Sequence, residues 1–107
     1  MEPNRDDEGW GVLSDGMRRA IVLRLADRPQ AVGELAAELP ISRPAVSQHL
    51  KVLKDAGLVA EKAAGTRRIY HLEAAGVAAL RDQLDTFWNR ALSNYRNIVD
   101  PSTEEMP

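Results

Sequence analysis

The stretch that decides the fold is Leu35–Leu58, which reads LAAELPISRPAVSQHLKVLKDAGL. Its first part completes a short helix expected over 32–39, in which apolar residues recur three and four positions apart: Val32, Leu35, Ala36 and Leu39. Pro40 ends this helix, and Ser42 is a favourable N-cap for a second helix that carries a proline in its first turn. The pattern therefore predicts a helix-turn-helix, with the second helix over 43–56.

The second helix has one apolar side and one polar side. On a helical wheel of roughly 100° per residue, Val46, Leu50 and Leu53 fall on one line. The opposite side carries Arg43, Ser47, Gln48, Lys51, Lys54 and Asp55. Cations suit phosphates, while short hydroxyl and amide groups can bond base edges in a major groove. In an isolated amphipathic helix, the polar side is more often simply exposed to solvent. Support for DNA binding therefore has to come from the sequence around this helix.

A β-hairpin is expected directly after this helix. Gly57 suits a helix C-cap, and two strand-like runs over 58–64 and 67–72 flank the turn at Gly65. Arg67 and Arg68 lie at the tip, and Lys62 lies on the outgoing strand. Such a tip could contact a phosphate backbone or enter a minor groove, whereas the alternative is an edge hairpin whose charges only prevent aggregation.

Three runs of the chain carry a resemblance to a known family. They are LSDGMRRAIVLRL at 13–25, VGELAAELPISRPAVSQHLKVLKDAGLV at 32–59 and GTRRIYHL at 65–72. Together they resemble the ArsR-type winged-helix repressors over about residues 10–100. The resemblance implies a mainly α-helical winged helix-turn-helix with a small β-hairpin. It also implies a bacterial homodimer that binds an inverted repeat in a promoter, blocks transcription and reads DNA through residues 43–56.

The chain departs from the founding members of that family in its metal-binding residue types. Those members bind arsenicals or divalent metals through thiolates, or through His and carboxylate pairs on the last helix, but this chain has no cysteine. Its last helix offers only Asp82 and Asp85 as carboxylates, and a transition metal needs three or four converging ligands. The sequence is thus similar to the metal-independent branch, and we expect no metal site and no cofactor. A repressor that responds to a ligand, or to a metal bound through His71 or carboxylates, stays as an alternative, and no inducer is identified.

The two histidines have different expected roles. His49 lies at the border of the apolar side of the second helix, where it would touch a phosphate or pack against the wing. His71 lies at the end of the hairpin and is expected to be a half-buried structural ring. The expected DNA-binding residues are accordingly Arg43, Ser47, Gln48, His49, Lys51, Lys54, Arg67 and Arg68.

The net charge is –2, which at first argues against DNA. Its distribution resolves the conflict. Residues 1–8 hold four acids and one base, and residues 100–107 hold three acids and no base; without these ends the chain has 13 basic and 9 acidic residues. We expect disordered acidic tails at 1–8 and 101–107 and one DNA-binding domain over 9–100.

A long helix is expected over 74–99, with a repeating apolar stripe that includes most of the aromatic side chains. It would be roughly 39 Å long, more than so small a domain needs for its own core. We therefore expect it to pair with a second copy, helped by a short helix at about 10–14. The expected interface residues are Trp10, Leu13, Leu84, Phe87, Trp88, Ala91 and Tyr95.

Several function classes are disfavoured. The sequence contains no nucleophile elbow, phosphate-binding loop or paired-carboxylate motif, so an enzyme is not expected. Its acidic start is unlike a secretory signal and no apolar run suits a membrane span, so we expect a cytoplasmic protein. A winged helix that binds a protein partner in place of double-stranded DNA remains the main alternative from another class.

Overall fold

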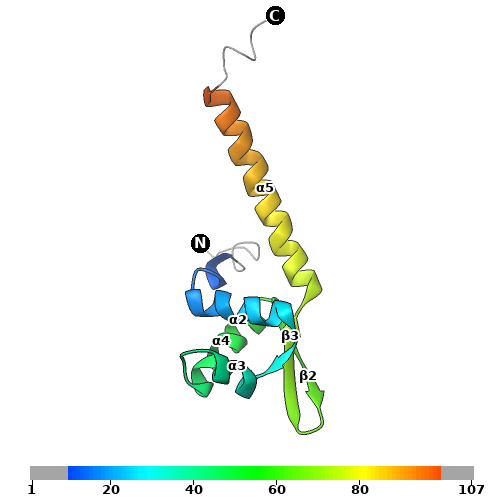
Figure 1. Cartoon of the computed structure of the whole chain (residues 1–107). Helices are drawn as coiled ribbons and strands as arrows, with labels where there is room; N and C mark the ends of the chain where they lie inside the picture. The colour runs from blue at the N-terminus through cyan, green and yellow to red at the C-terminus, as the bar shows by residue number, and fades with distance from the viewer. Residues whose placement is uncertain (1–9, 100–107) are drawn as a thin grey trace, which may run out of the picture.

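The computed structural model describes the backbone of residues 10–99 and the side chains of residues 10–97. The expected tails at 1–8 and 101–107 lie outside this range. The element order is α2 (Gly16–Asp27), β1 (Gln30–Ala31), α3 (Val32–Glu38), α4 (Arg43–Asp55), β2 (Val59–Ala64), β3 (Arg67–Leu72) and α5 (Ala74–Val99), as Figure 1 shows. The winged helix-turn-helix class is confirmed. Of the short helix expected at 10–14, the described residues 10–12 are helical and residues 13 and 14 form a turn.

The ends of α4 are defined by local hydrogen bonds. At its start, the Ser42 hydroxyl accepts a hydrogen bond from the Ala45 amide over 3.2 Å. At its end, the Gly57 amide donates to the Lys54 carbonyl over 2.9 Å, and the Leu58 amide donates to the Leu53 carbonyl over 3.0 Å. These two bonds form a Schellman motif, and Gly57 has the positive φ of 81° that this motif requires. The helix thus ends at Asp55, one residue before the predicted end.

The wing is a three-stranded antiparallel sheet in the order β1-β3-β2. Strands β2 and β3 form the expected hairpin, with Ala64 opposite Arg67 and a turn in which Gly65 has a φ of 66°. The sequence did not predict β1, whose residues Gln30 and Ala31 pair with β3. Because β1 joins the sheet immediately before α3, it ties the base of the wing to the first helix of the helix-turn-helix.

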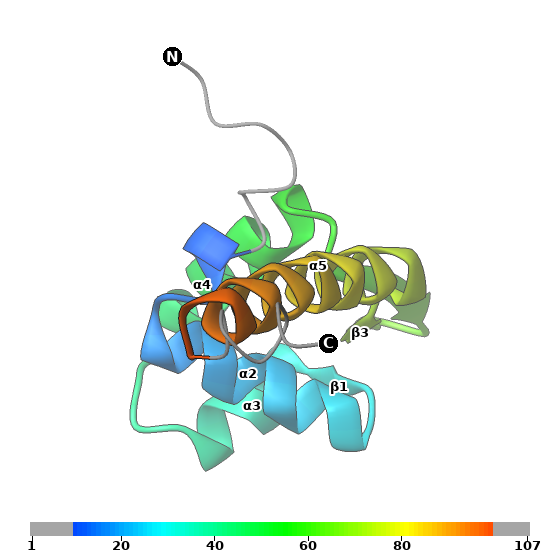
Figure 2. The ribbon, with the colours of Figure 1, turned by 90° about the horizontal axis from the view of Figure 1, so that it is seen from above.

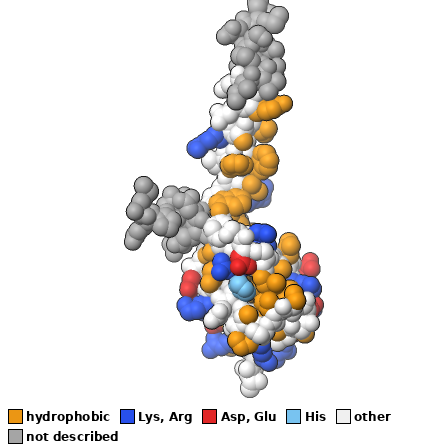
Figure 3. All heavy atoms as spheres, turned by 90° about the vertical axis from the view of Figure 1, so that its left-hand side faces the viewer, with side chains coloured by type: hydrophobic (Ala, Val, Ile, Leu, Met, Phe, Trp, Pro, Cys, Tyr) orange, Lys and Arg blue, Asp and Glu red, His pale blue; other side chains and the backbone are white. Residues whose placement is uncertain are grey.

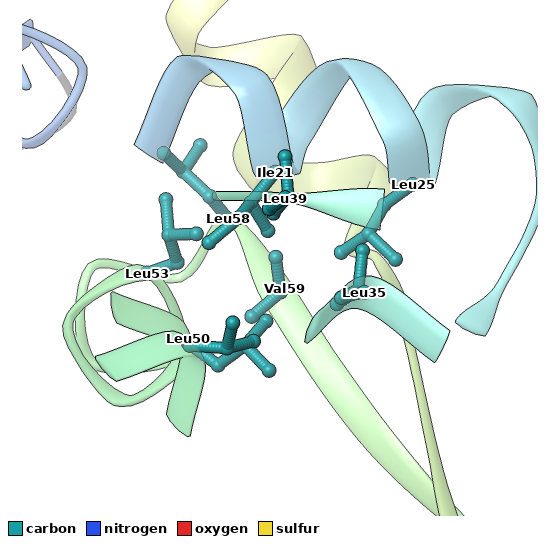
Figure 4. Close-up of a cluster of buried hydrophobic side chains, with 9 residues drawn as sticks. Ile21, Leu25, Leu35, Leu39, Leu50, Leu53, Leu58 and Val59 are labelled. Atoms are coloured by element: carbon teal, nitrogen blue, oxygen red, sulfur yellow. The ribbon is translucent and has the colours of Figure 1, made fainter. Parts of the chain in front are cut away.

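One hydrophobic core holds α2, α3, α4 and the start of β2 together. Figure 4 shows leucine, isoleucine and valine side chains from these elements pointing toward one another. The buried cluster consists of Ile21, Leu25, Leu35, Leu39, Val46, Leu50, Leu53, Leu58 and Val59. The predicted apolar line of α4 is therefore buried, and its polar side is left on the surface.

Helix α5 extends far beyond this core. The described part of the chain measures 69 Å along its longest axis but only 27 and 26 Å along the others. Figure 1 shows α5 projecting from the body, and Figure 2 looks down on it from above. Gly76 allows its first turn to approach the end of α4, because a Cβ at this position would overlap the Gly57 carbonyl oxygen. Leu80 packs against the core, whereas the larger apolar side chains farther along α5 are exposed.

Candidate nucleic-acid interface

The exposed side of α4 carries the polar residues that the sequence singled out. Arg43, Ser47, Gln48, Lys51 and Lys54 are all exposed. They occupy the side of the helix opposite the buried Val46, Leu50 and Leu53. A helix of 13 residues, held by its apolar side and presenting hydroxyl, amide and cationic groups on the other, has the form of a major-groove reading element.

Arg43 connects this helix to the wing across a hollow. A Cβ built on Gly33 would lie 3.6 Å from the Arg43 guanidinium carbon, so the arginine lies directly over the first turn of α3. The hollow has a volume of about 200 Å³ and is lined by Ala31, Val32, Arg43, Thr66, Arg67 and Arg68. Arginines of α4 and β3 therefore border the same hollow, and a cationic rim of this kind favours an anion such as a backbone phosphate.

Both arginines at the wing tip also have carboxylate partners within the chain. The Arg67 guanidinium donates to the Glu34 carboxylate over 2.8 Å, and that of Arg68 donates to Glu61 over 2.6 Å. The sequence placed both arginines near the tip and named no partner for either, so the structure adds this pairing. It does not remove them from the surface, because their side chains are 58% and 69% exposed.

Two lysines of α4 are paired in the same way. The Lys51 ammonium lies 3.1 Å from the Asp55 carboxylate, one helical turn away. The Lys54 ammonium lies 3.2 Å from Glu61 of β2. Among the expected cationic contacts in the described chain, Arg43 alone has neither an ion pair nor a hydrogen bond from its side chain to another residue.

Glu61 is a residue of this surface that sequence reasoning missed. Its carboxylate lies between Lys54 of α4 and Arg68 of β3 and is only 18% exposed. A hydrogen bond from the Tyr70 hydroxyl, followed by the one from Lys54, lowers the pKa of Glu61 below its ordinary value. The pKa of Tyr70 is raised, first by burial and then by this carboxylate. The hairpin register was a usable signal, because Glu61 pairs with Tyr70 and thereby faces the strand that carries Arg68.

His49 is hydrogen-bonded to α2, a contact that the sequence did not predict. Its Nδ1 accepts a hydrogen bond from Arg18 Nε of α2 over 3.2 Å. The ring is half-buried. In the neutral tautomer that accepts at Nδ1, the proton is on Nε2, which leaves that atom as a donor. His71 is also half-buried, as expected, and its Nδ1 donates to the Leu72 carbonyl over 3.1 Å.

A second candidate surface runs along α5. Large apolar side chains follow the helix in Figure 3, and Phe87, Trp88 and Tyr95 are each more than half exposed. The Phe87 and Trp88 rings meet edge to face with centroids 5.7 Å apart. Of the other expected interface residues, Trp10 and Leu84 are exposed, while Leu13 and Ala91 are half-buried. An apolar stripe of this size on a projecting helix is typical of a protein interface.

Within the described residues, histidines and carboxylates nowhere gather in a group of three that could hold a metal ion. None of the helices between residues 10 and 99 has the length and apolar character needed to cross a membrane.

Comparisons with known proteins agree with this geometry. The family model described as "Bacterial regulatory protein, arsR family" matches residues 15–61. The HTH-type transcriptional regulator Rv2034 of Mycobacterium tuberculosis is 60% identical over 99 residues, which span 92% of each protein. The crystal structure of a possible transcriptional regulator for arsenical resistance is 41% identical with a TM-score of 0.69, and the match covers 78% of this chain and 92% of that one.

A solution structure adds information on assembly. It is the homodimeric winged helix-turn-helix DNA-binding domain of a possible ArsR-family regulator from Mycobacterium bovis. This domain is 27% identical to the chain with a TM-score of 0.67, and the match covers 84% of this chain and 83% of that one.

Proposed function

The chain belongs to the ArsR family of bacterial regulatory proteins, and we propose that it acts as a homodimeric transcriptional repressor that binds an inverted-repeat operator. The observation that carries the proposal is the exposed polar side of α4, which continues across the Arg43 hollow into the cationic wing. A duplex offers base edges to such a helix and phosphates to the cations on either side. Transcription is blocked because the bound dimer occupies the promoter.

Each expected DNA-binding residue has a role in this proposal. Arg43, Ser47, Gln48 and Lys51 are at the major groove, where Gln48 can pair with adenine and Ser47 with any base. Lys54, Arg67 and Arg68 contact the backbone and set the register on the duplex. His49 sits at the edge, where Nε2–H can donate to a phosphate while Nδ1 stays with Arg18.

The second copy binds through α5 and the first helical turn. On a wheel of roughly 100° per residue, the apolar side chains from Val77 to Tyr95 occupy one continuous arc. Pairing this arc with its copy would remove on the order of 1,000 Å² from water, near the lower range for a stable dimer. A twofold dimer then places two α4 helices in successive major grooves, about 34–36 Å apart. Residues 9–100 thus form one DNA-binding and dimerising unit.

The proposed regulator acts without a metal and without a cofactor. The chain has no thiolate, and the carboxylates of α5 have no histidine beside them on that helix. Such a protein responds to another signal or to its own concentration. Its relatives are transcriptional regulators, so we propose a non-enzymatic protein that works on DNA in the bacterial cytoplasm.

A mobility-shift experiment tests the proposal. The intact chain is titrated into genomic fragments that contain bacterial promoters, at low salt and with excess random duplex as competitor. The proposal predicts a shifted species that survives the competitor on a subset of fragments. Absence of any shift at low salt would contradict it and would favour a winged helix that binds a protein partner. Added divalent metal should leave the shifted species unchanged, and release by metal would contradict the metal-independent part of the proposal.

A further inference from the structure

We propose that Glu61 acts as a built-in competitor of DNA: its carboxylate takes the place of a backbone phosphate for Lys54 and Arg68, and so lowers the affinity for duplexes of any sequence. This inference rests on the proposed function. It adds an anionic residue, on a strand of the wing, that sets how strongly the cationic surface binds nonspecifically.

The contacts of Glu61 are those that a phosphate oxygen would make. One carboxylate oxygen accepts from the Lys54 ammonium over 3.2 Å and from the Arg68 guanidinium over 2.6 Å. The two cations come from α4 and β3, which are the two elements proposed to hold the duplex. Carboxylate and phosphate are both oxyanions that bind these groups through charge-assisted hydrogen bonds. The two anions therefore compete for the same donors.

Burial makes Glu61 a persistent competitor. Its side chain is 18% exposed, while those of Lys54 and Arg68 are 49% and 69% exposed. Tyr70 lies directly opposite Glu61 in the register of the hairpin, so the carboxylate is flanked by an aromatic side chain of the neighbouring strand. When Lys54 and Arg68 turn toward a phosphate, Glu61 cannot turn away with equal freedom, so its negative charge stays beside the backbone of the duplex and repels it.

The other carboxylates of the surface lack this combination. Asp55, which pairs with Lys51, is 66% exposed and belongs to the same helix, so it can move into solvent. Glu34, which pairs with Arg67, also accepts a hydrogen bond from the Ala31 amide and so caps the start of α3. Glu61 is the carboxylate that lies between two proposed DNA contacts.

The test compares binding of the full chain and its variants to a labelled random duplex of about three helical turns, by fluorescence anisotropy over a series of KCl concentrations. Glu61→Gln removes the charge but keeps the size and shape of the side chain. Asp27→Asn is the matched control, because it changes the net charge equally at an exposed residue of α2 that has no ion-pair partner in the described chain. Arg68→Ala and the double variant Glu61→Gln/Arg68→Ala complete a cycle, and thermal melting checks that each is folded.

We expect Glu61→Gln to bind the random duplex about threefold to tenfold more tightly than wild type, with a slope of log K against log salt steeper by about one unit at most. Asp27→Asn should stay within about twofold of wild type, since its charge lies outside the pairs. In the Arg68→Ala background, the gain from Glu61→Gln should fall clearly, because one of its two partners is gone.

A folded Glu61→Gln variant that binds no more tightly than Asp27→Asn would overturn the inference, as would an equal gain with and without Arg68. Either result would leave the proposed function intact. Failure of wild type itself to bind any duplex at low salt would instead refute the proposed function, and this inference with it.

Discussion

Truncation of Trp88 on α5 should separate the dimer into monomers. This side chain is 51% exposed in the single chain and lies in the middle of the apolar arc. A tryptophan can bury up to about 250 Å², so about half of that area is available to a partner. At about 25 cal/mol per Å², covering it contributes on the order of 3 kcal/mol per copy, or on the order of 6 kcal/mol for two copies.

This free energy sets the expected shift in the dissociation constant of the dimer. A loss of the full 6 kcal/mol, on the order of magnitude estimated above, would raise the dissociation constant about 10,000-fold. Incomplete burial of Trp88 in the dimer would make the loss smaller, so we expect Trp88→Ala to raise the dissociation constant by about 100-fold to 10,000-fold. Sedimentation velocity over a range of protein concentrations measures it. The folded body should be little affected, because Trp88 lies beyond Leu80, the α5 residue that packs on the core.

Leu23→Ala provides the matched control. Leu23 is also a large exposed apolar side chain, at 68%, but it lies on α2. Its truncation should leave the dissociation constant within about threefold of wild type, because isolated exposed leucines are common on protein surfaces. The α5 interface would be refuted if Trp88→Ala dimerised as tightly as wild type, or if both variants weakened the dimer equally.

The remaining predictions concern DNA contacts, packing and pH. Gln48→Ala should lower the preference for operator over random duplex, whereas Arg68→Ala should weaken both alike and make the salt slope shallower by about one unit at most; equal losses with no change in slope would refute these roles. Gly76→Ala should lower the melting temperature, because its Cβ would overlap the Gly57 carbonyl oxygen; an unchanged value would refute the close approach of α5. The Asp15 carboxylate accepts from the amides at the start of α2, which lowers its pKa below the ordinary value of 3.8. It therefore stabilises the fold above that pH and ceases to do so as pH falls through the lower folded-state pKa. Between the ordinary and the lowered pKa of Asp15, the melting temperature of Asp15→Asn should therefore fall less with decreasing pH than that of wild type. The same dependence of melting temperature on pH in both proteins would contradict this prediction.

Local patterns in the sequence predicted most of the elements. The strand Arg67–Leu72 and the helix Ala74–Val99 have the predicted bounds, since turn residues and an apolar stripe marked them. Strand β1 was missed because two residues carry no periodicity, and their pairing with β3 depends on the assembled fold. The same limit applies to His49, whose partner Arg18 lies 31 residues earlier in the chain.

The candidate site was predictable in its residue types but not in its pairing. The polar side of α4 follows from the helical period, and its residues are exposed as predicted. The ion pair between Arg67 and Glu34 joins residues 33 positions apart, so no local pattern could reveal it. The pair between Arg68 and Glu61 was within reach, because the hairpin register places both residues around Tyr70.

Selection of binding sites from a library of random duplexes tests the central claim most directly. The purified intact chain is used to enrich duplexes over several rounds, and the enriched pool is sequenced. The account predicts a pseudo-palindromic site whose half-sites are centred about one helical turn apart, because two α4 helices must enter successive major grooves. A pool with no enriched sequence, or an enriched site without twofold symmetry, would contradict it.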